Sequence, residues 1–536
     1  MKSFDRIVWM FLLLLSLGLA SIFFLKENDL VETTFPISPW ADADGIKWIF
    51  LPSWYQAADF EPEDPQTVVV TSANLPTIAI TTEGGSMDHF LEDKTVRESG
   101  TMKVWNEDGT VSWAGKLKEI RSRGNTTLGQ AKQAFQIKIE KDFGLLGMES
   151  GSTWVLLANA FDDSGIRNMI ALDMAQRAGM QYVSQWRCVD LYCNGIYWGN
   201  YLLTEKVEVG KGRVETSGGF LIEREFPDRI EEIEYGFVTG EGDCYIQHFP
   251  QDGKGMERIQ ALVEDFEQAV KQKDGRHPQT GRYYAEYIDL DSFARKYILE
   301  EILLNVDGGA SSAYYYTKGE QRLFAGPPWD YDLAMGNCLD QKESVMDPRN
   351  IVFGRQQGEM GTRIYEYLWQ HTDFQKEVRD LYASQFRPFL DELLTEGIDR
   401  YVELIRPSWS MNKIRWKDVG NWNRYYKDYQ TEYRYLKFFF DARKKTLDRE
   451  WLGILEDKDY SGLWKTPETH QVIYAIDGEA WKIDEVADGT LLESFPIPPG
   501  YDEKEMEWIR DETDRPVSLG RPILEDEIFV WVPKSD

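Results

Sequence analysis

Alternating apolar and polar positions dominate the first half of the chain. The run TIAITT, from Thr77, is rich in β-branched residues and ends at the turn signal Gly84-Gly85. Asp108-Gly109 separates two further alternating runs, and Asn194-Gly195 separates RCVDLYCNG from YWGNYLLTEKVEV. Both of these dipeptides favour the tight turns of β-hairpins. The pattern therefore predicts a β-rich unit that begins near residue 77.

One predicted strand of this unit is apolar on one side only. Apolar residues alternate with polar ones from Phe135 to Ile139, so the opposite side of the strand carries Lys138. The later segment GIRNMIALDMAQRAG contains few helix-breaking residues. It predicts a helix, with Ser164 as the N-cap.

Helical periodicity replaces alternation after Gly255. Apolar residues recur at i, i+3, i+4 and i+7 spacing from Ile259 to Phe266, and the pattern repeats over residues 293–302. Residues 357–455 continue as long amphipathic segments rich in Tyr, Trp and Leu. A β-rich half followed by a helical half predicts an α+β body of two lobes over residues 76–455.

The C-terminal part, residues 466–536, returns to strand-like alternation. VIYAIDGEAWKIDEV, DGTLLESFPIPPGY and EDEIFVWV predict the strands of a small antiparallel unit. This unit resembles the β-repeat module of internalin-B-type bacterial surface proteins, on the basis of Asp477-Gly478, Gly489-Thr490, Pro499-Gly500-Tyr501 and Trp508. The resemblance implies a module that binds or spaces rather than one that catalyses.

The N-terminus carries a targeting signal. Two basic residues within the first six precede an almost uninterrupted apolar run, Ile7–Leu25, which is long enough to span a bilayer. Basic residues before this run and acidic residues after it predict that the body is extracytoplasmic. Residues 1–30 are therefore either an uncleaved membrane anchor or a cleaved signal peptide. Residues 31–75 lack sustained periodicity and are predicted to be a connector.

Composition narrows the classes of function. Asp and Glu outnumber Lys and Arg by 91 to 60, and this negative field argues against a nucleic acid partner. The 4 cysteines are irregularly spaced, so no disulfide scaffold is implied. The 5 histidines are isolated and no HExxH motif occurs, so a zinc hydrolase has no support.

The most informative stretch is EEILLNVDGGASSAYYYTKGEQRLFAGPPWDYDLAMGN. A predicted helix leads to Asp307, and a predicted hairpin of strands Ser311–Thr317 and Arg322–Ala325 follows before Asp330 and Asp332. Because the open ends of two antiparallel strands lie together, Asp307 should converge with Asp330 and Asp332.

Such a set of carboxylates suits phosphoryl transfer. Three carboxylates at one hairpin mouth repel one another unless a cation neutralises them, and magnesium prefers oxygen ligands of this kind. In phosphoryl transfer, one Asp orients the attacking hydroxyl and a second holds the metal ion that bridges the nucleotide phosphates. The phosphates also need a lysine from a strand, for which Lys138 fits better than Lys132.

Six sequence blocks, taken together and in this order, resemble the CotH-like family (spore coat protein H) of atypical protein kinases. The resemblance covers about residues 77–450, and the blocks are RGNTTLGQAKQAFQIKIE, WVLLANAFDDSGIRNMIALDMA, GIYWGNYLLTEKVEV, GGFLIERE, NVDGGASSAYYYTKG and PWDYDLAMGN. It implies a protein-kinase-like fold, ATP with Mg²⁺ or Mn²⁺, and phosphorylation of Ser or Thr on a secreted, surface or spore-coat protein.

The resemblance also implies roles for individual residues. Lys138 would contact the phosphates, Asp307 would be the catalytic aspartate, and Asp330 would bind the metal, with Asp332 as a second acidic ligand or a structural partner. Two further cofactor-binding candidates are Glu205, at the end of the strand that leads to the adenine-contacting hinge, and Arg123. The matching residues Asn125, Arg167 and Asn168 receive no defined role.

Each assignment has an ordinary structural alternative. Asp307 could terminate its helix, and Asp330 and Asp332 could pair with arginines or cap a helix. A solvated lysine is common on an alternating strand, so Lys138 has the same ambiguity. Arg123, like Arg167, could form internal ion pairs instead of phosphate contacts.

One departure from the family bears on activity. Many relatives carry Asn four or five positions after the catalytic Asp, where it can bind a second metal, whereas this chain has Ser311 and Ser312. Either one metal suffices or activity is reduced. Two functions remain open, namely a kinase and a catalytically weak cell-surface scaffold or binding protein that keeps the fold. A carboxylate-pair glycosidase explains neither the lysine strand nor the ordered blocks.

Overall fold

The computed structural model does not describe every part of the chain. The described residues are 37–55, 62, 64–72, 75–124, 126–230, 234–319, 321–338, 343–353, 363–417, 419–420, 425–455, 458–501, 506–511 and 515–534. The candidate anchor Ile7–Leu25 and Asn125 lie outside them. Within these ranges, no helix is both long and apolar enough to cross a membrane.

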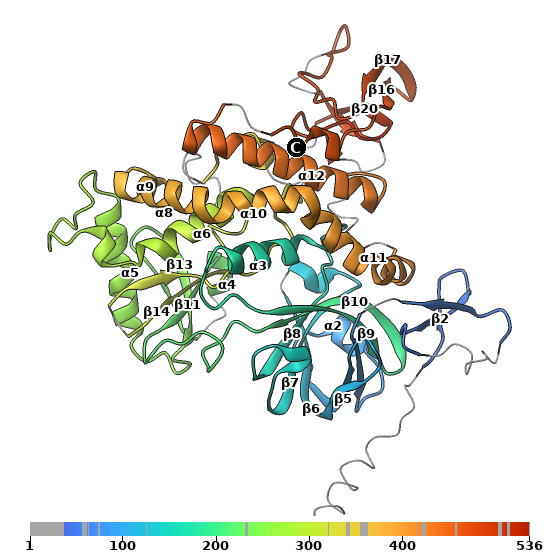
Figure 1. The fold of residues 1–536 in the computed structure, drawn as a ribbon, viewed down its shortest axis with the longest axis horizontal. Coiled ribbons are helices and arrows are strands. Elements are labelled where there is room, and N and C mark those ends of the chain that lie inside the picture. The colour runs from blue at the N-terminus through green and yellow to red at the C-terminus, as the bar shows by residue number, and fades with distance from the viewer. Residues whose placement is uncertain are drawn as a thin grey trace, which may run out of the picture.

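A closed β-barrel forms the first large unit of the described structure (Figure 1). Its strands follow the order β10-β8-β7-β6-β5-β4-β9. Their bounds are β4 Thr77–Thr82, β5 Glu98–Trp105, β6 Val111–Arg123, β7 Ala134–Phe143, β8 Gly151–Leu157, β9 Trp186–Cys193 and β10 Ile196–Glu205, and helix α2, Asp88–Glu92, lies between β4 and β5. Phe135, Ile137 and Ile139 are buried in the barrel core, so the alternate residues Gln136 and Lys138 of β7 point outward.

A small sheet packs on the outside of the barrel, where the sequence predicted a connector. Its order is β1-β2-β3, with bounds Trp40–Ala41, Lys47–Leu51 and Val68–Thr71. The ring of Phe50 lies 4.7 Å from that of Tyr197, and the Tyr192 hydroxyl donates a hydrogen bond to the Phe50 carbonyl at 3.1 Å. This part of the predicted connector is therefore folded against the body.

Helix α3, Arg167–Arg177, lies between the barrel and the helical half (Figure 1). The prediction of Ser164 as its N-cap is wrong, because Ile166 occupies that position. Asp162 instead accepts hydrogen bonds from the backbone amides of Ser164 and Arg167, both at 3.0 Å. A carboxylate just upstream thus takes the role that the sequence assigned to the serine.

A second sheet, five-stranded in the order β12-β13-β11-β14-β15, stands beside the barrel. The bounds of these strands and their short neighbour are β11 Leu221–Glu225, α4 Pro227–Ile230, β12 Gly236–Val238, β13 Cys244–Phe249, β14 Ala313–Thr317 and β15 Leu323–Ala325. The predicted hairpin after Asp307 is therefore present, and β14 pairs with β15 through Tyr315 opposite Ala325.

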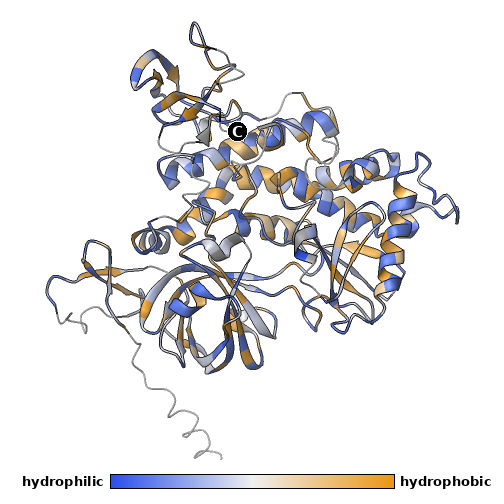
Figure 2. Ribbon diagram, turned by 180° about the vertical axis from the view of Figure 1, so that it is seen from behind, coloured by the Kyte–Doolittle hydropathy of each residue, from blue (hydrophilic) through white to orange (hydrophobic). Residues whose placement is uncertain are grey.

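Helices build the rest of the body, as the periodicity predicted. Their bounds are α5 Met256–Val270, α6 Leu290–Leu303, α7 Glu343–Met346, α8 Ile364–Trp369, α9 Thr372–Leu381, α10 Arg387–Glu392, α11 Ile398–Arg415 and α12 Tyr429–Leu447. In α5, Ile259, Val263 and Phe266 are buried in the main core. The helices carry hydrophilic residues between the hydrophobic ones (Figure 2), which is typical of amphipathic helices around one core. The α+β class is confirmed.

The C-terminal module forms a five-stranded sheet in the order β17-β16-β20-β18-β19. The bounds are β16 Thr469–Ile476, β17 Glu479–Ala487, β18 Met506–Arg510, β19 Arg515–Pro516 and β20 Glu527–Pro533. The prediction of a purely antiparallel unit is wrong, because β16 and β20 pair in parallel. Residues 491–501 form no strand, and they contain prolines, which cannot donate to a ladder. The resemblance to internalin-B-type repeats is not confirmed.

Candidate active site

The β14–β15 hairpin brings the three predicted aspartates together. Helix α6 ends with Leu304 in the left-handed conformation at φ +47°. The backbone carbonyl of Asp307 begins the next turn by accepting a hydrogen bond from the backbone amide of Ser311 at 2.9 Å. Beyond β15, Asp330 itself has φ +67°, and its carboxylate accepts a hydrogen bond from the Ser312 hydroxyl at 3.2 Å. The two open ends of the hairpin therefore meet, as predicted.

The charges of these aspartates act on one another. Burial raises the pKa of Asp307 to about 7, and the charges of Asp330 and Glu225 act in the same direction. Burial raises the pKa of Asp332 well above its usual range, and the charges of Asp330 and Asp307 add to that effect. A group of carboxyls with such raised pKa values holds protons or a cation more readily than isolated aspartates do.

Two glutamates of β11 extend the acidic site, and the sequence analysis assigned them no role. Glu225 accepts hydrogen bonds from the Ser311 hydroxyl at 2.7 Å and the Ser312 amide at 3.2 Å, and burial raises its pKa. Glu223 lies 2.6 Å from the imidazole of His248. Their i, i+2 spacing in the block GGFLIERE places both on one face of a strand, which was the available signal.

Ser311 and Ser312 are thus in contact with the acidic site. The Ser311 hydroxyl binds Glu225 and the Ser312 hydroxyl binds Asp330. Ser312 also has φ +52°, which directs its short side chain toward the hairpin mouth. Each hydroxyl thus donates a hydrogen bond to a carboxylate of the acidic site and helps to orient it.

Arg123, at the end of β6, is a barrel residue whose charge acts on Asp330. Its guanidinium lies 4.9 Å from the ring centre of Trp329. Burial raises the pKa of Asp330, and the charge of Arg123 acts against that rise. Arg121, two residues earlier on the same side of β6, donates to the outward-facing Gln136 at 3.1 Å. The barrel therefore supplies positive charge beside the aspartates.

Neither predicted lysine contacts the aspartates in the described residues. Lys138 is partly buried on the outer side of β7, opposite Glu119 and Thr153. Lys132 is buried and donates to the carbonyls of Ala158 at 2.7 Å and Asn200 at 2.5 Å. Lys132 is therefore a structural residue, whereas Lys138 keeps its ammonium on the outside of the barrel.

Glu205, the predicted hinge residue at the end of β10, forms an internal ion pair. Its carboxylate lies 2.7 Å from the Arg213 guanidinium and accepts the Gln185 amide at 3.0 Å. Only 4% of its surface is exposed. The side chain is thus held by protein groups at the place where the sequence predicted a contact with the cofactor.

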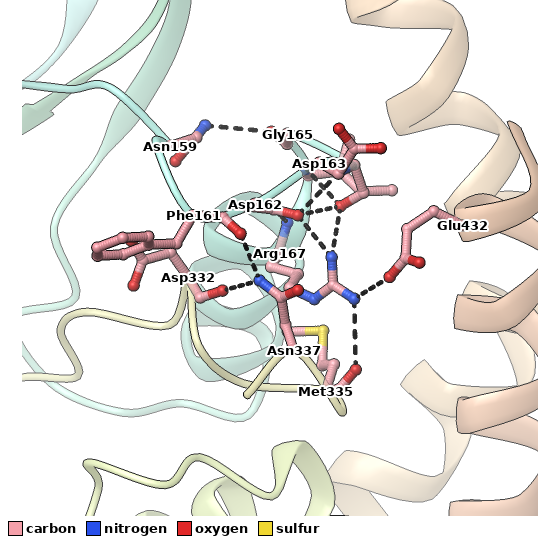
Figure 3. Close-up of polar contacts among 12 residues, drawn as sticks. Asn159, Phe161, Asp162, Asp163, Gly165, Arg167, Asp332, Met335, Asn337 and Glu432 are labelled. Atoms are coloured by element: carbon pink, nitrogen blue, oxygen red, sulfur yellow. Dashed lines mark hydrogen bonds and ion pairs between the residues drawn. The ribbon is translucent and has the colours of Figure 1, made fainter. Parts of the chain in front are cut away.

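Arg167 and Asn168 both bind backbone groups of the segment that carries Asp330 and Asp332, and Figure 3 shows the ion pairs of Arg167. Arg167 is fully buried, forms ion pairs with Asp162 and Glu432, and donates to the Ala334 carbonyl at 3.0 Å. Asn168 accepts the backbone amide of Tyr331 at 3.0 Å, between Asp330 and Asp332. The internal ion-pair alternative for Arg167 is therefore the one that the structure shows.

The oxygen atoms of Asp307, Asp330 and Asp332 are ligands that a hard cation prefers. They are not already arranged as a complete metal-binding site. Among the residues that the structure describes, no group of three or more His, Cys, Asp or Glu side chains is arranged to hold a metal ion. Magnesium at nucleotide sites commonly uses one or two carboxylates together with phosphates and waters. The three converging carboxylates, with their raised pKa values, fit that mode of binding.

Fold and site together define a mixed α+β protein in which a hairpin gathers acidic side chains beside the arginines of a barrel. This class has a match among protein families. The family model described as CotH kinase protein matches residues 120–447, more than half of the chain, and the protein belongs to that family. The matched range begins in β6 and ends with α12, so it contains all the candidate site residues. No curated protein matches the chain.

Proposed function

We propose that this protein is an extracytoplasmic atypical protein kinase with two lobes, the barrel and the helical half. In this proposal it transfers the γ-phosphoryl group of ATP to a Ser or Thr hydroxyl of a secreted, surface or spore-coat protein. The single observation that carries the proposal is the convergence of Asp307, Asp330 and Asp332 at one hairpin mouth beside Arg123.

Asp307 suits the role of general base. A group whose pKa lies near 7 can accept a proton at neutral pH and release it afterwards. In the proposed step, the acceptor oxygen bonds to the γ-phosphorus while the bond from phosphorus to the bridging oxygen breaks. ADP leaves with that oxygen, and the proton of the hydroxyl passes to the Asp307 carboxylate.

The remaining residues would bind and orient the nucleotide. Asp330 and Asp332 would hold Mg²⁺ or Mn²⁺, which when bound neutralises charge on the phosphates. Arg123 already lies beside Asp330, so it would bind a phosphate oxygen there. Lys138 faces outward on the same barrel and would bind a phosphate of the nucleotide, as the family resemblance implies.

The proposed location depends on the apolar run Ile7–Leu25, which would act as an anchor or a signal peptide. ATP is scarce outside cells. The reaction would therefore take place in a special compartment, such as a developing spore.

The decisive test is a nucleotide-dependent rise in melting temperature with and without Mg²⁺. Ligand at a hundred times its Kd stabilises a protein by about 2.7 kcal/mol, which such a measurement detects easily. We expect the rise in the wild type and its loss in Asp330→Asn and Asp307→Asn. Asp380→Asn is the control, because Asp380 only forms an exposed ion pair with Lys376.

A second function, a surface scaffold that keeps the fold without catalysis, is favoured by one observation. This chain has Ser311 and Ser312 at the positions where the family resemblance implies a metal-binding Asn. Transfer of labelled phosphate from ATP to extracellular proteins would support the kinase. The absence of any melting shift at millimolar ATP and Mg²⁺ would support the scaffold.

A further inference from the structure

The C-terminal module is joined to the body by specific polar contacts along α12 (Figure 1). Arg434 of α12 pairs with Asp488 at 2.5 Å and donates to the Leu524 carbonyl at 3.1 Å. The Tyr426 hydroxyl, just before α12, donates to the Pro522 carbonyl at 2.9 Å. The module is therefore packed against the body rather than tethered by a free linker.

One side chain of the module passes through this interface and reaches the loop after Asp332. Arg521 is 6% exposed, and its guanidinium donates a hydrogen bond to the Gly336 carbonyl. The same guanidinium lies over the rings of Tyr435 at 4.3 Å and Tyr425 at 4.5 Å. These rings confine the arginine, so its direction toward Gly336 is fixed.

The loop that Arg521 reaches is a tight turn. Met335 has φ +56° and Gly336 has φ +75°, a left-handed pair that costs free energy at the methionine. A Cβ atom at Gly336 would collide with the Tyr435 hydroxyl. Such a turn persists only where its surroundings hold it in place.

Two arginines hold consecutive carbonyls of this turn from different sides. Arg167 of the body donates to the carbonyls of Ala334 at 3.0 Å and Met335 at 3.4 Å, and Figure 3 shows the second of these bonds. Arg521 of the module donates to the next carbonyl, that of Gly336. The body and the module therefore share the support of one turn.

The turn is connected directly to the acidic site. The Asn337 amide side chain donates to the Asp332 carbonyl at 2.6 Å and to the Phe161 carbonyl at 2.9 Å (Figure 3). Met335 donates its backbone amide to the Leu303 carbonyl, at the end of α6, at 2.7 Å. A shift of the turn would displace Asp332 relative to Asp307.

We infer that the C-terminal module is part of the working site and that Arg521 is a positioning residue for the loop that carries Asp330 and Asp332. The module would thereby set how well these carboxylates hold a nucleotide-bound divalent cation. The part concerning the cation rests on the proposed function. The part concerning the loop rests on the contacts of Arg521 alone.

The test uses the full chain with Arg521→Met, which keeps volume but removes the donor, and Arg521→Lys, which keeps a charged donor. Hydrogen exchange of the amides of residues 331–337 is measured without nucleotide or metal. Loss of one charged hydrogen bond corresponds to about tenfold, so we expect about tenfold faster exchange in Arg521→Met and partial recovery in Arg521→Lys. The Mg²⁺ concentration needed for half of the ATP-induced melting shift should rise by a similar factor.

Arg434→Met is the matched control, because Arg434 fastens the same module without touching the turn. It should lower the melting temperature while leaving exchange of residues 331–337 unchanged. Unchanged exchange in Arg521→Met, or equal acceleration in Arg434→Met, would overturn the inference. A wild type that shows no ATP shift would refute the proposed function instead, while the exchange measurement would still decide the role of Arg521.

Discussion

Two groups of buried acidic side chains lie near the turn at residues 334–336, and they differ in how they are neutralised. Asp162 and Glu432 both form ion pairs with Arg167, each at 2.5 Å. We call these three residues the paired cluster. Asp307, Asp330 and Asp332 form a second group, which we call the open cluster. Burial raises the pKa of Asp332 in this cluster, and the charges of Asp330 and Asp307 add to that effect.

The difference separates structural from functional carboxylates. In the paired cluster, protein groups satisfy the charges, which is what a buried structural network requires. In the open cluster, the Ser312 hydroxyl and the charge of Arg123 favour the ionised form of Asp330 only in part, because burial still raises its pKa. Buried carboxyl groups whose pKa values stay raised, because protein groups compensate their charge only in part, are typical of functional sites.

The largest expected effect comes from breaking the paired cluster. Arg167→Leu should destabilise the fold by about 3–5 kcal/mol, because it removes the positive charge that neutralises two buried carboxylates. Urea unfolding measures this loss. Arg177→Gln is the control, since its half-exposed pair with Glu392 should contribute only about 0–1 kcal/mol. A similar small loss in both variants would contradict the assigned importance of the paired cluster.

The open cluster should give the protein an unusual pH dependence when metal is removed with a chelator. The pKa of Asp307 is raised to about 7 in the folded state, so unfolded chains release this proton first as pH increases above about 4. The contribution of this group to stability is complete below its unfolded pKa and is lost by about pH 7, by at most about 4 kcal/mol.

Asp307→Asn tests whether Asp307 causes this loss of stability with increasing pH. The variant should lose part of the decline in stability between pH 4 and 7, and it should be no less stable than the wild type at pH 8. Unfolding free energies measured at several pH values in the chelator give the comparison. An identical decline in the variant and the wild type would show that Asp307 is not the group responsible.

The smallest expected effect is that of Glu205→Gln, which tests whether Glu205 takes part in nucleotide binding as the open cluster is proposed to do. Glu205→Gln should cost about 1–3 kcal/mol, because it leaves the buried Arg213 guanidinium without its carboxylate. If Glu205 serves only this ion pair, the melting shift caused by ATP and Mg²⁺ stays as large as in the wild type. A reduced shift would instead support a contact between Glu205 and the adenine.

Features that depend on neighbouring residues were predictable from the sequence. The Asn194-Gly195 hairpin, the β14–β15 hairpin and helix α3 are encoded by turn residues and periodicity, and the structure has all three. The convergence of Asp307 with Asp330 followed from the hairpin alone. Alternation in β7 also gave the correct outward side for Lys138.

Features that depend on distant partners were not predictable. The parallel pairing of β16 with β20 joins residues such as Val472 and Glu527, far apart in the chain. The alternation of a strand does not reveal its partner or direction. Lys132 and Glu205 also read as accessible polar residues, and only the packing shows them enclosed by carbonyls and by Arg213.

The small sheet of β1, β2 and β3 has a practical consequence for any recombinant form of this protein. A version shortened to start at Thr77 would lack Phe50 and Trp54, whose aromatic rings pack against the outside of the barrel. Tyr197 and Trp105, whose ring centres lie 4.7 Å from that of Phe50 and 5.5 Å from that of Trp54, would lose these neighbours. Aromatic surface exposed in this way favours aggregation. Expression should therefore begin no later than Ile37.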